Sequence, residues 1–462
     1  MESENSKLKK VLNSRDLIAL AFGAAIGWSW IALLGEWLTT AGTIGAIFGF
    51  LIGGFVVMLI GIAYAELTAS LPDIGGSHGF TLKGLGYKGS FICSWALTLS
   101  YIGVVAFEAC ALPFVLESVF PALRFGYLYT VGGTDIYLSS ILFGVFSSLM
   151  ITYINYKGME FSSWIQRLFF YAIFGVGILL VIASLTKGSM DKVPPYFVDG
   201  LDGLMKVAVM TPFLLVGFDV IPQASAEADL PPRRLAKLML ASIVIATVWY
   251  CIIIFCVSSL VSRQELMTSE LPTATALVNG WGGAEIAKLV VVIGGLCGIL
   301  SSWNAFIVAG SRVLYQMSRS EMLPAWFGEL DEKSSMPDHS VIFIGLLSCA
   351  APFFGFQFLI WISNVASLST IIAYGLTVLA FVRLRKIEPW MKRPYRIKGG
   401  KYLGPVAVVI AVAMLVLYLP GMPSGLNLVE WVLTGAWALL GLVIYQQSVR
   451  KKKERSKPSS KT

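Results

Sequence analysis

Residues 211–222 read TPFLLVGFDVIP and lie in an apolar segment long enough to cross a membrane. Pro212 and Pro222 lack the amide donor that an α-helix uses, and Gly217 between them adds backbone freedom. The stretch therefore predicts a helix that is interrupted within the membrane. Lipid cannot satisfy the amides and carbonyls that an interruption leaves unpaired, so the break is expected to line a cavity or to hold a ligand.

A second irregular stretch lies five predicted spans earlier. Residues 22–30 read FGAAIGWSW, and Gly23 and Gly27 also have the four-residue spacing that lets helices pack closely, so a break and a packing contact are both open here. If both segments are broken, half-helix ends meet near the centre of the membrane. Unpaired amides there attract a carboxylate and unpaired carbonyls attract an ammonium group, which together suit a zwitterionic amino acid.

The rest of the chain is apolar as well. It has 462 residues, of which 56% are hydrophobic and 13% are charged, too few charges for the surface of a soluble protein of this size. Apolar runs of about 20 residues recur, the length that crosses a hydrocarbon core of about 30 Å. We predict an all-α integral membrane protein with about twelve spans, near residues 15–40, 43–68, 91–118, 136–155, 162–186, 202–222, 236–261, 284–315, 340–354, 357–382, 403–420 and 427–447.

The formal net charge of +8 would also fit a nucleic-acid-binding protein, but the basic residues lie in alternate loops. With the N-terminus in the cytoplasm, most of the 35 basic residues fall on the cytoplasmic side; the exceptions are Arg124, Lys187, Lys192, Lys206, Arg263 and Lys288. This bias is typical of a bundle with both termini in the cytoplasm. The expected partners are the lipid bilayer and a small-molecule substrate, with no nucleic acid.

Short motifs follow each other in order along nearly the whole chain. Besides residues 22–29 and 213–219 they are Ala65-Glu66-Leu67 with Pro72 and Gly75-Gly76, Glu227 with Pro231-Pro232-Arg233-Arg234, Ser311-Arg312 with Leu323-Pro324, and Leu384-Arg385 with Glu388-Pro389 and Arg393-Pro394-Tyr395. Together they resemble the motifs of the amino acid-polyamine-organocation permeases, which share the leucine-transporter type of fold.

The resemblance implies a 5+5 inverted repeat with broken first and sixth helices, followed by two more helices. It divides the chain into a cytoplasmic tail (1–14), a first repeat (15–190), a second repeat (200–390), helices 11 and 12 (402–447) and a basic cytoplasmic tail (448–462). It also implies an amino acid permease of the cytoplasmic membrane that works by alternating access, coupled to protons or sodium or exchanging substrates. The alternatives are an amine, polyamine or ethanolamine permease and a non-transporting amino acid sensor.

The family's substrate site carries over to residues of both predicted breaks. In such permeases, amides of the first broken helix bind the substrate carboxylate, and carbonyls of both broken helices face its amino group. The corresponding residues are Ala25, Ile26, Gly27, Trp28, Ser29, Phe213, Leu214, Val216 and Gly217. Phe213 also matches an aromatic residue that caps the substrate, with a core aromatic as the alternative. Trp28 departs from the small residues of many relatives, and its ring either narrows the pocket or leans into the bundle.

Two carboxylates lie inside predicted spans. A carboxylate at the centre of a membrane helix costs roughly 2.5–3.5 kcal/mol on insertion scales, which indicates an internal role for Asp219. The hypothesis is that Asp219 links protonation to opening of an inner gate; the alternative is a structural carboxylate that accepts hydrogen bonds from freed amides. Glu108 either faces an amine substrate or a proton path, or is paired within the bundle.

The coupling ion is the only cofactor that the sequence suggests. Ser301 and Ser302 are candidates for a sodium site beside the first-helix carbonyls, because sodium prefers hard oxygen ligands; serines that bond back to their own helix are the alternative. Some related permeases that are proton-coupled carry a lysine on the fifth helix. Residues 168–186 contain no lysine, which excludes proton coupling through that residue.

Other classes of function need residues that are absent from the sequence. A membrane-embedded enzyme needs a cluster of His, Cys or acidic groups, and the two histidines, His78 and His339, are far apart in the chain. A channel needs a pore lined by repeated polar or charged residues rather than two broken helices. The protein is therefore not expected to be an enzyme, and no resident metal is expected.

Overall fold

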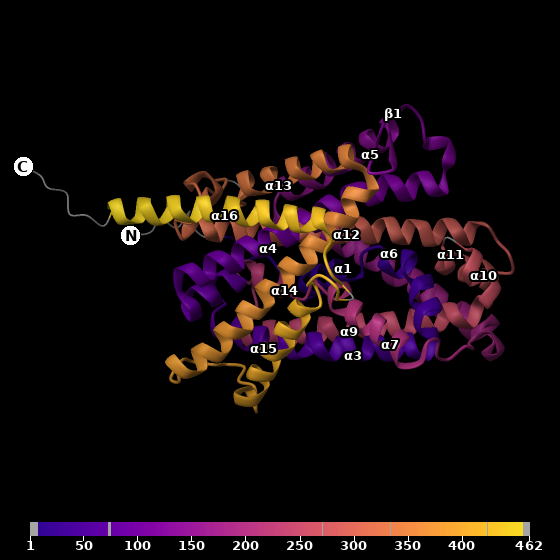
Figure 1. Ribbon diagram of the computed structural model, residues 1–462, viewed down its shortest axis with the longest axis horizontal. Helices are drawn as coiled ribbons and strands as arrows, with labels where there is room; N and C mark the ends of the chain where they lie inside the picture. The colour runs from indigo at the N-terminus through magenta and orange to yellow at the C-terminus, as the bar shows by residue number, and fades with distance from the viewer. Residues whose placement is uncertain (1–7, 73–74, 270, 333, 423, 456–462) are drawn as a thin grey trace, which may run out of the picture.

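The computed structural model describes residues 8–72, 75–269, 271–332, 334–422 and 424–455. Helices form most of it, as Figure 1 shows. The helices are α1 (Ser14–Ile26), α2 (Ser29–Ala32), α3 (Leu34–Ser70), α4 (Gly76–Val119), η2 (Pro121–Leu123), α5 (Leu138–Tyr156), α6 (Met159–Lys187), η3 (Met190–Lys192), α7 (Gly200–Leu214), α8 (Val220–Gln223), η4 (Ser225–Glu227), α9 (Pro232–Leu260), α10 (Arg263–Thr268), α11 (Pro272–Gly280), α12 (Ile286–Arg319), η5 (Ala325–Gly328), α13 (Asp338–Ala350), η6 (Ala351–Phe354), α14 (Gly355–Ile387), α15 (Gly400–Val416) and α16 (Leu428–Arg455). The strands are β1 (Tyr127–Val131) and β2 (Thr134–Tyr137).

The helices have the lengths and surfaces of membrane spans. Among the described residues, eight helices are long and apolar enough to cross a membrane, and Asp338–Phe354 and Gly400–Val416 are apolar but shorter. Large apolar side chains stay on the outside of the bundle; Phe146 is 68% exposed and Leu185 is 81% exposed. Such a surface suits lipid rather than water. The prediction of an all-α membrane protein is confirmed.

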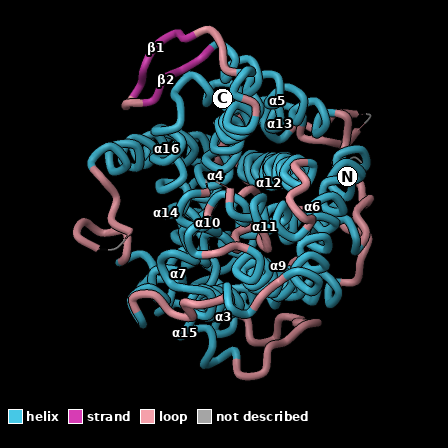
Figure 2. Tube along the Cα trace, turned by 90° about the vertical axis from the view of Figure 1, so that its right-hand side faces the viewer, coloured by secondary structure: helices cyan, strands magenta, loops and turns pink. Residues whose placement is uncertain are grey.

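The bundle has two distinct ends. The C-terminal end of α16 lies at the left of Figure 1, and we call this end the terminal side. The antiparallel pair β1 and β2, together with α10 and α11, lies at the right, and we call that end the hairpin side. Figure 2 looks at the bundle from the hairpin side, so that most helices are seen end-on.

The first predicted span is broken, as the sequence indicates. Asn13 starts α1 with a capping box that it forms with Asp16, and the helix ends at Ile26, before the short helix α2. The next boundary falls at Gly42, whose φ of 75° interrupts the helical path of α3. The segment before Gly42 therefore belongs to the first span and the segment after it to the second, in agreement with the boundary predicted between residues 40 and 43.

The sixth predicted span is also broken. It consists of α7 and α8, which are separated by residues 215–219. Glycines on α3 bring α7 close: a Cβ atom at Gly49 would lie 2.8 Å from Val207 Cγ1, so a larger residue would push α7 away. This contact holds the broken helix against α3, beside the centre of the bundle.

Several elements are not predicted by the search for apolar runs. A helical segment precedes the predicted third span and joins it at Gly86, which has φ 79°. The hairpin of β1 and β2 turns at Gly132 and Gly133, both with positive φ, as a tight hairpin turn requires. Helix α16 extends beyond the predicted last span, which ends at residue 447, and continues to Arg455 in the predicted basic tail. Residues 1–7 and 456–462 of the two predicted tails lie outside the described residues.

Candidate functional site

The first break lies between α1 and α2. Gly27 has φ 46° and ψ −136°, a conformation that favours glycine. Its carbonyl oxygen faces Gly298 of α12, where a Cβ atom would overlap it. Glycine at both positions therefore lets the broken segment pack directly on α12.

The carbonyl end of α1 faces Tyr250 of α9. The Tyr250 hydroxyl lies 2.9 Å from the carbonyl oxygen of Ala25, 3.2 Å from that of Ile26 and 2.7 Å from Ser29 Oγ. The resemblance to the permeases implies that both carbonyls face the amino group of a substrate, and the structure places a protein hydroxyl beside them. The Ser29 hydroxyl also donates to the carbonyl oxygen of Ile26, at 3.2 Å. A carbonyl oxygen has two lone pairs, so acceptor capacity remains at Ala25.

The second break, residues 215–219, packs against the first. Gly217 has φ 139°, and a Cβ atom there would lie 2.7 Å from the amide nitrogen of Ala25. Asp219 is fully buried; its Oδ1 accepts a hydrogen bond from the Gly217 amide at 3.1 Å, and its Oδ2 accepts one from Tyr101 Oη at 2.5 Å. Asp219 thus takes over an amide that the broken helix leaves without a carbonyl partner.

A cavity of about 600 Å³ lies beside both breaks, within the size range of small-molecule sites. The residues predicted to bind substrate that line it are Ala25, Ile26, Gly27, Trp28, Ser29, Phe213, Leu214 and Val216. Gly217 is not among the lining residues, because it lies behind the cavity against α1. The two predicted breaks therefore share one cavity.

The two aromatic residues of the prediction lie in different walls of the cavity. Trp28 is 8% exposed, and its ring covers Gly295 of α12, where a Cβ atom would overlap the ring. The ring therefore leans onto α12 while it still lines the cavity. Phe213 lines the cavity from the last turn of α7 and is half-buried.

The cavity extends from the breaks toward the hairpin side. Its lining includes Glu36 near the start of α3, Phe114 near the end of α4 and Ile360 near the start of α14, and these helix ends all lie on that side. Toward the terminal side, the buried rings of Tyr64, Phe218 and Tyr374 pack together, with centroids 5.3–5.6 Å apart. In this conformation the closed layer is on the terminal side of the breaks.

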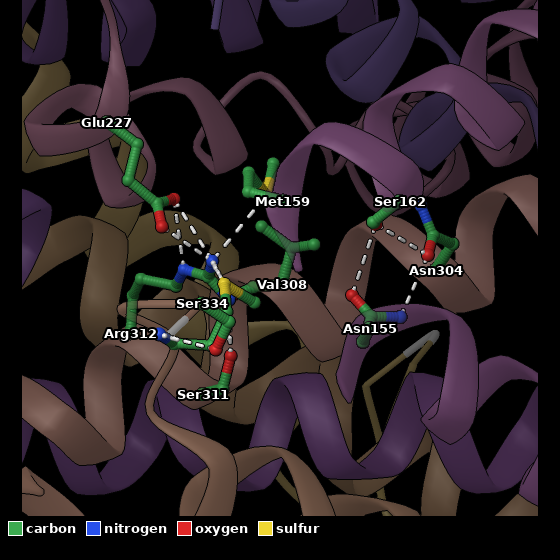
Figure 3. A network of polar contacts seen from close by, with 10 residues as sticks. Asn155, Met159, Ser162, Glu227, Asn304, Val308, Ser311, Arg312 and Ser334 are labelled. Atoms are coloured by element: carbon green, nitrogen blue, oxygen red, sulfur yellow. Dashed lines mark hydrogen bonds and ion pairs between the residues drawn. The ribbon is translucent and has the colours of Figure 1, made fainter. Parts of the chain in front are cut away.

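Three ion pairs reinforce the terminal side. They are Asp16 of α1 with Arg167 of α6, Glu66 of α3 with Arg385 of α14, and Glu227 of η4 with Arg312 of α12. In each pair the acid belongs to the group of helices that contains the breaks, α1–α3 and α7–α9, and the arginine belongs to the helices around it. Figure 3 shows the third pair. Separation of the two groups on this side would break all three pairs.

The two serines of α12 that were candidates for a sodium site differ in position. Ser302 lines the cavity and Ser301 does not. The Ser301 hydroxyl accepts a hydrogen bond from Gln166 Nε2 at 2.7 Å, and the same nitrogen lies 3.1 Å from the carbonyl oxygen of Ala19. The side-chain amide of Gln166 thus fills the space between α1 and α12 at Ser301. No motif around Gln166 in the sequence indicates this role.

Glu108 of α4 lies in the wall of the cavity beside the first break. Its side chain is 3% exposed, and its Oε2 atom has no hydrogen-bond partner among the described residues. A Cβ atom at Gly27 would lie 3.7 Å from Glu108 Oε1 and 3.9 Å from Ser302 Oγ. The carboxyl group, the serine hydroxyl and the first break therefore meet at one point of the cavity.

Comparison with known proteins gives matches along the whole length. A family model described as amino acid permease matches residues 16–457. The chain is 22% identical to a methylthioribose transporter and 24% identical to the branched-chain amino acid permease BcaP, both of Bacillus subtilis strain 168, and each match covers 96% of this chain and 94% of the relative. It is also 25% identical to an aspartate-proton symporter of the same strain, over 93% of this chain and 82% of the relative.

Proposed function

The chain belongs to the amino acid permease family, and on that basis we propose that it carries an amino acid or a related amine across the cytoplasmic membrane. The observation that carries this proposal is the cavity of about 600 Å³ that both helix breaks line. A cavity beside unwound backbone offers binding groups at membrane depth without exposing them to lipid. The proposed orientation has both termini in the cytoplasm, so the hairpin side faces outward.

The chemistry of the breaks supports a substrate with an amino and a carboxyl group. The first amides of α2, near Trp28 and Ser29, have no preceding helical turn to accept their hydrogen bonds, and they suit a carboxylate. The carbonyl of Ala25 retains acceptor capacity beside Tyr250 and suits an ammonium group. In this proposal Phe213 covers the substrate from the side of α7.

Transport by alternating access is the proposed mechanism. The conformation described here has its cavity on the hairpin side, which is the outward-facing state in the proposed orientation. The group of α1–α3 and α7–α9 would then tilt against the surrounding helices, which separates the three ion pairs on the terminal side and closes the hairpin side. Breaking buried ion pairs is costly, and substrate binding would offset part of this cost.

The coupling mode is proposed to be proton symport, sodium symport or exchange. Asp219 is the proton candidate, because it is a buried carboxylate between the second break and Tyr101. Ser302 remains a candidate ligand for sodium at the cavity wall, whereas the Ser301 hydroxyl is engaged by Gln166. The three modes differ in which gradient drives uptake, so one assay separates them.

The test is uptake into proteoliposomes of purified protein. A panel of radiolabelled amino acids, amines, polyamines and ethanolamine is offered under an inward proton gradient, an inward sodium gradient, and with unlabelled substrate inside. Liposomes without protein and liposomes with a Gly217→Val variant, which places a branched side chain against Ala25, serve as controls. Saturable uptake that both controls lack supports the proposal.

Two alternatives predict other outcomes. An amine permease would transport amines and polyamines but no amino acid of the panel. A sensor would show no transport under any gradient, while a panel member still raised the melting temperature of the purified protein. If no compound of the panel is transported and none shifts the melting temperature, the proposal is wrong.

A further inference from the structure

The cavity contains a carboxyl group that the protein leaves without a countercharge. Glu108 is almost fully buried and its Oε2 atom has no partner among the described residues. The cavity lining as described contains no lysine, arginine or histidine. The second acidic residue of the lining, Glu36, lies nearer the hairpin side and is exposed.

A buried carboxylate without a countercharge is costly at membrane depth. Pairing within the bundle, which was the structural alternative for Glu108, would remove the cost, and the ion pairs of Glu66 and Glu227 show that this protein uses that solution elsewhere. The side chain that forms a hydrogen bond with Glu108 is that of Ser302, whose hydroxyl is neutral. When Glu108 holds a proton it is neutral; when it is ionised, a bound cation has to supply the positive charge, because the described lining has no basic side chain.

This inference rests on the proposed function. We propose that the substrate is an organic cation, a basic amino acid or a diamine, and that Glu108 binds the ammonium group that the backbone of the two breaks does not neutralise. The breaks already offer amides for one carboxylate and carbonyls for one ammonium group. A neutral zwitterion would satisfy them and leave Glu108 unpaired, whereas a substrate with a second ammonium group satisfies both.

The rest of the cavity fits the stem of such a substrate. Phe107 precedes Glu108 on α4, and Phe213 and Phe306 line the cavity from α7 and α12. Aromatic and aliphatic walls are suited to the methylene chain between two charged groups. The exposed carboxylate of Glu36 near the entrance would add a negative potential that attracts cations from the hairpin side.

The test compares ligands that differ in one ammonium group. Lysine against norleucine and ornithine against norvaline are added to the purified full-length protein, and the apparent dissociation constants are measured from the shift in melting temperature. The same pairs compete for uptake in proteoliposomes. Lysine is expected to bind about tenfold or more tightly than norleucine, as for a hydrogen bond to a charged group. Equal binding of the two by the unmodified protein overturns the inference.

Variants then assign the preference to Glu108. Glu108→Gln keeps the size of the side chain and is expected to remove the preference for lysine, whereas Glu108→Asp is expected to keep part of it. Glu117→Gln is the matched control: Glu117 lies on the same helix and is equally buried, but it accepts hydrogen bonds from Ser139 and Ser140 away from the cavity lining. The control variant is expected to prefer lysine as the unmodified protein does.

The outcomes separate the inference from the proposed function. If Glu108→Gln weakens the binding of lysine and of norleucine by the same factor, Glu108 acts on a group that both ligands share. The proposal that the substrate is a cation is then wrong, although the proposed transport function stands. Uptake of norleucine that lysine does not inhibit would likewise show that the cation proposal is wrong and that the transport function stands. Loss of the preference in Glu117→Gln as well would show that it does not arise at Glu108.

Discussion

Arg312 and Glu227 form a two-pronged ion pair that is almost completely buried. Arg312 Nη2 lies 2.7 Å from Glu227 Oε1 and Arg312 Nε lies 3.2 Å from Oε2, and the two side chains are 1% and 2% exposed. The sulfur atoms of Met159 and Met336 cover the same guanidinium group at 3.5 Å and 3.3 Å. Figure 3 shows how the pair joins α12 to the segment that follows the second break.

Removal of one partner of this pair is expected to destabilise the protein strongly. Arg312→Met leaves the Glu227 carboxylate buried without a countercharge, which costs about 3–5 kcal/mol. Thermal unfolding in detergent measures the loss, and the double variant Arg312→Met with Glu227→Gln should recover most of it. The control is Lys206→Met, which removes the exposed pair of Lys206 with Asp202 and should change stability by less than about 0.5 kcal/mol. A double variant as unstable as Arg312→Met would contradict this account.

The contact between the two breaks is expected to tolerate no side chain at Gly217. In Gly217→Ala, the alanine would have to adopt a φ of 139°, which alanine rarely does. Its Cβ atom would also lie 2.7 Å from the amide nitrogen of Ala25. The cost is about 1–3 kcal/mol, and uptake should fall because the cavity wall moves. Gly175→Ala on α6 is the control, since open space surrounds that position. If both variants melt and transport alike, the breaks do not depend on this contact.

The breaks and the residues around them are predictable from the sequence because their causes are local. Pro212, Gly217 and Gly27 disturb the helical ladder at their own positions, and a membrane allows such a disturbance only beside a cavity. The resemblance to the permeases then singles out residues 25–29, which line the cavity in the structure. Charge in alternate loops likewise predicts the orientation of the spans in the membrane without knowledge of any contact.

The remaining features depend on partners that are distant in the sequence. Tyr250 lies 225 residues from Ala25 in the sequence. No local pattern indicates that a tyrosine in one apolar helix forms hydrogen bonds with the broken end of another helix. Gln166 meets Ser301 and Ala19 only after α1, α6 and α12 have packed together. The hairpin is different, because Gly132 and Gly133 are a recognised turn signal that a search for apolar runs passes over.

The hydroxyl of Tyr250 is expected to hold the carbonyl end of α1 in position. Tyr250→Phe removes the donor that faces Ala25 and Ile26 but keeps the ring that stacks on Phe50, with centroids 4.7 Å apart. The loss of one hydrogen bond costs about 0.5–1.5 kcal/mol. We expect a weaker apparent affinity in uptake assays, with little change in the melting temperature. Tyr171→Phe, on the exposed surface of α6, should leave both quantities unchanged.

Asp219 provides the sharpest test of proton coupling. If its protonation is linked to opening of the terminal side, Asp219→Asn should make the uptake rate nearly independent of pH, because the amide does not titrate. The carboxylate accepts hydrogen bonds from Tyr101 and from the amide of Gly217, so a purely structural role is the competing explanation. Uptake rates at several pH values, with the proton gradient imposed separately, distinguish the two explanations.

Tyr101→Phe completes this test, because it removes a partner of Asp219 without removing the carboxyl group. Tyr101 donates the 2.5 Å hydrogen bond to the titrating carboxyl group. Under proton coupling, Tyr101→Phe should therefore shift the pH at which uptake is half-maximal. Asp219→Asn should remove the pH dependence of uptake. Under a structural role, both variants should lower the melting temperature and the uptake rate while the shape of the pH profile stays that of the unmodified protein. Asp219→Asn with an unchanged pH profile would exclude Asp219 as the coupling group and leave sodium symport and exchange.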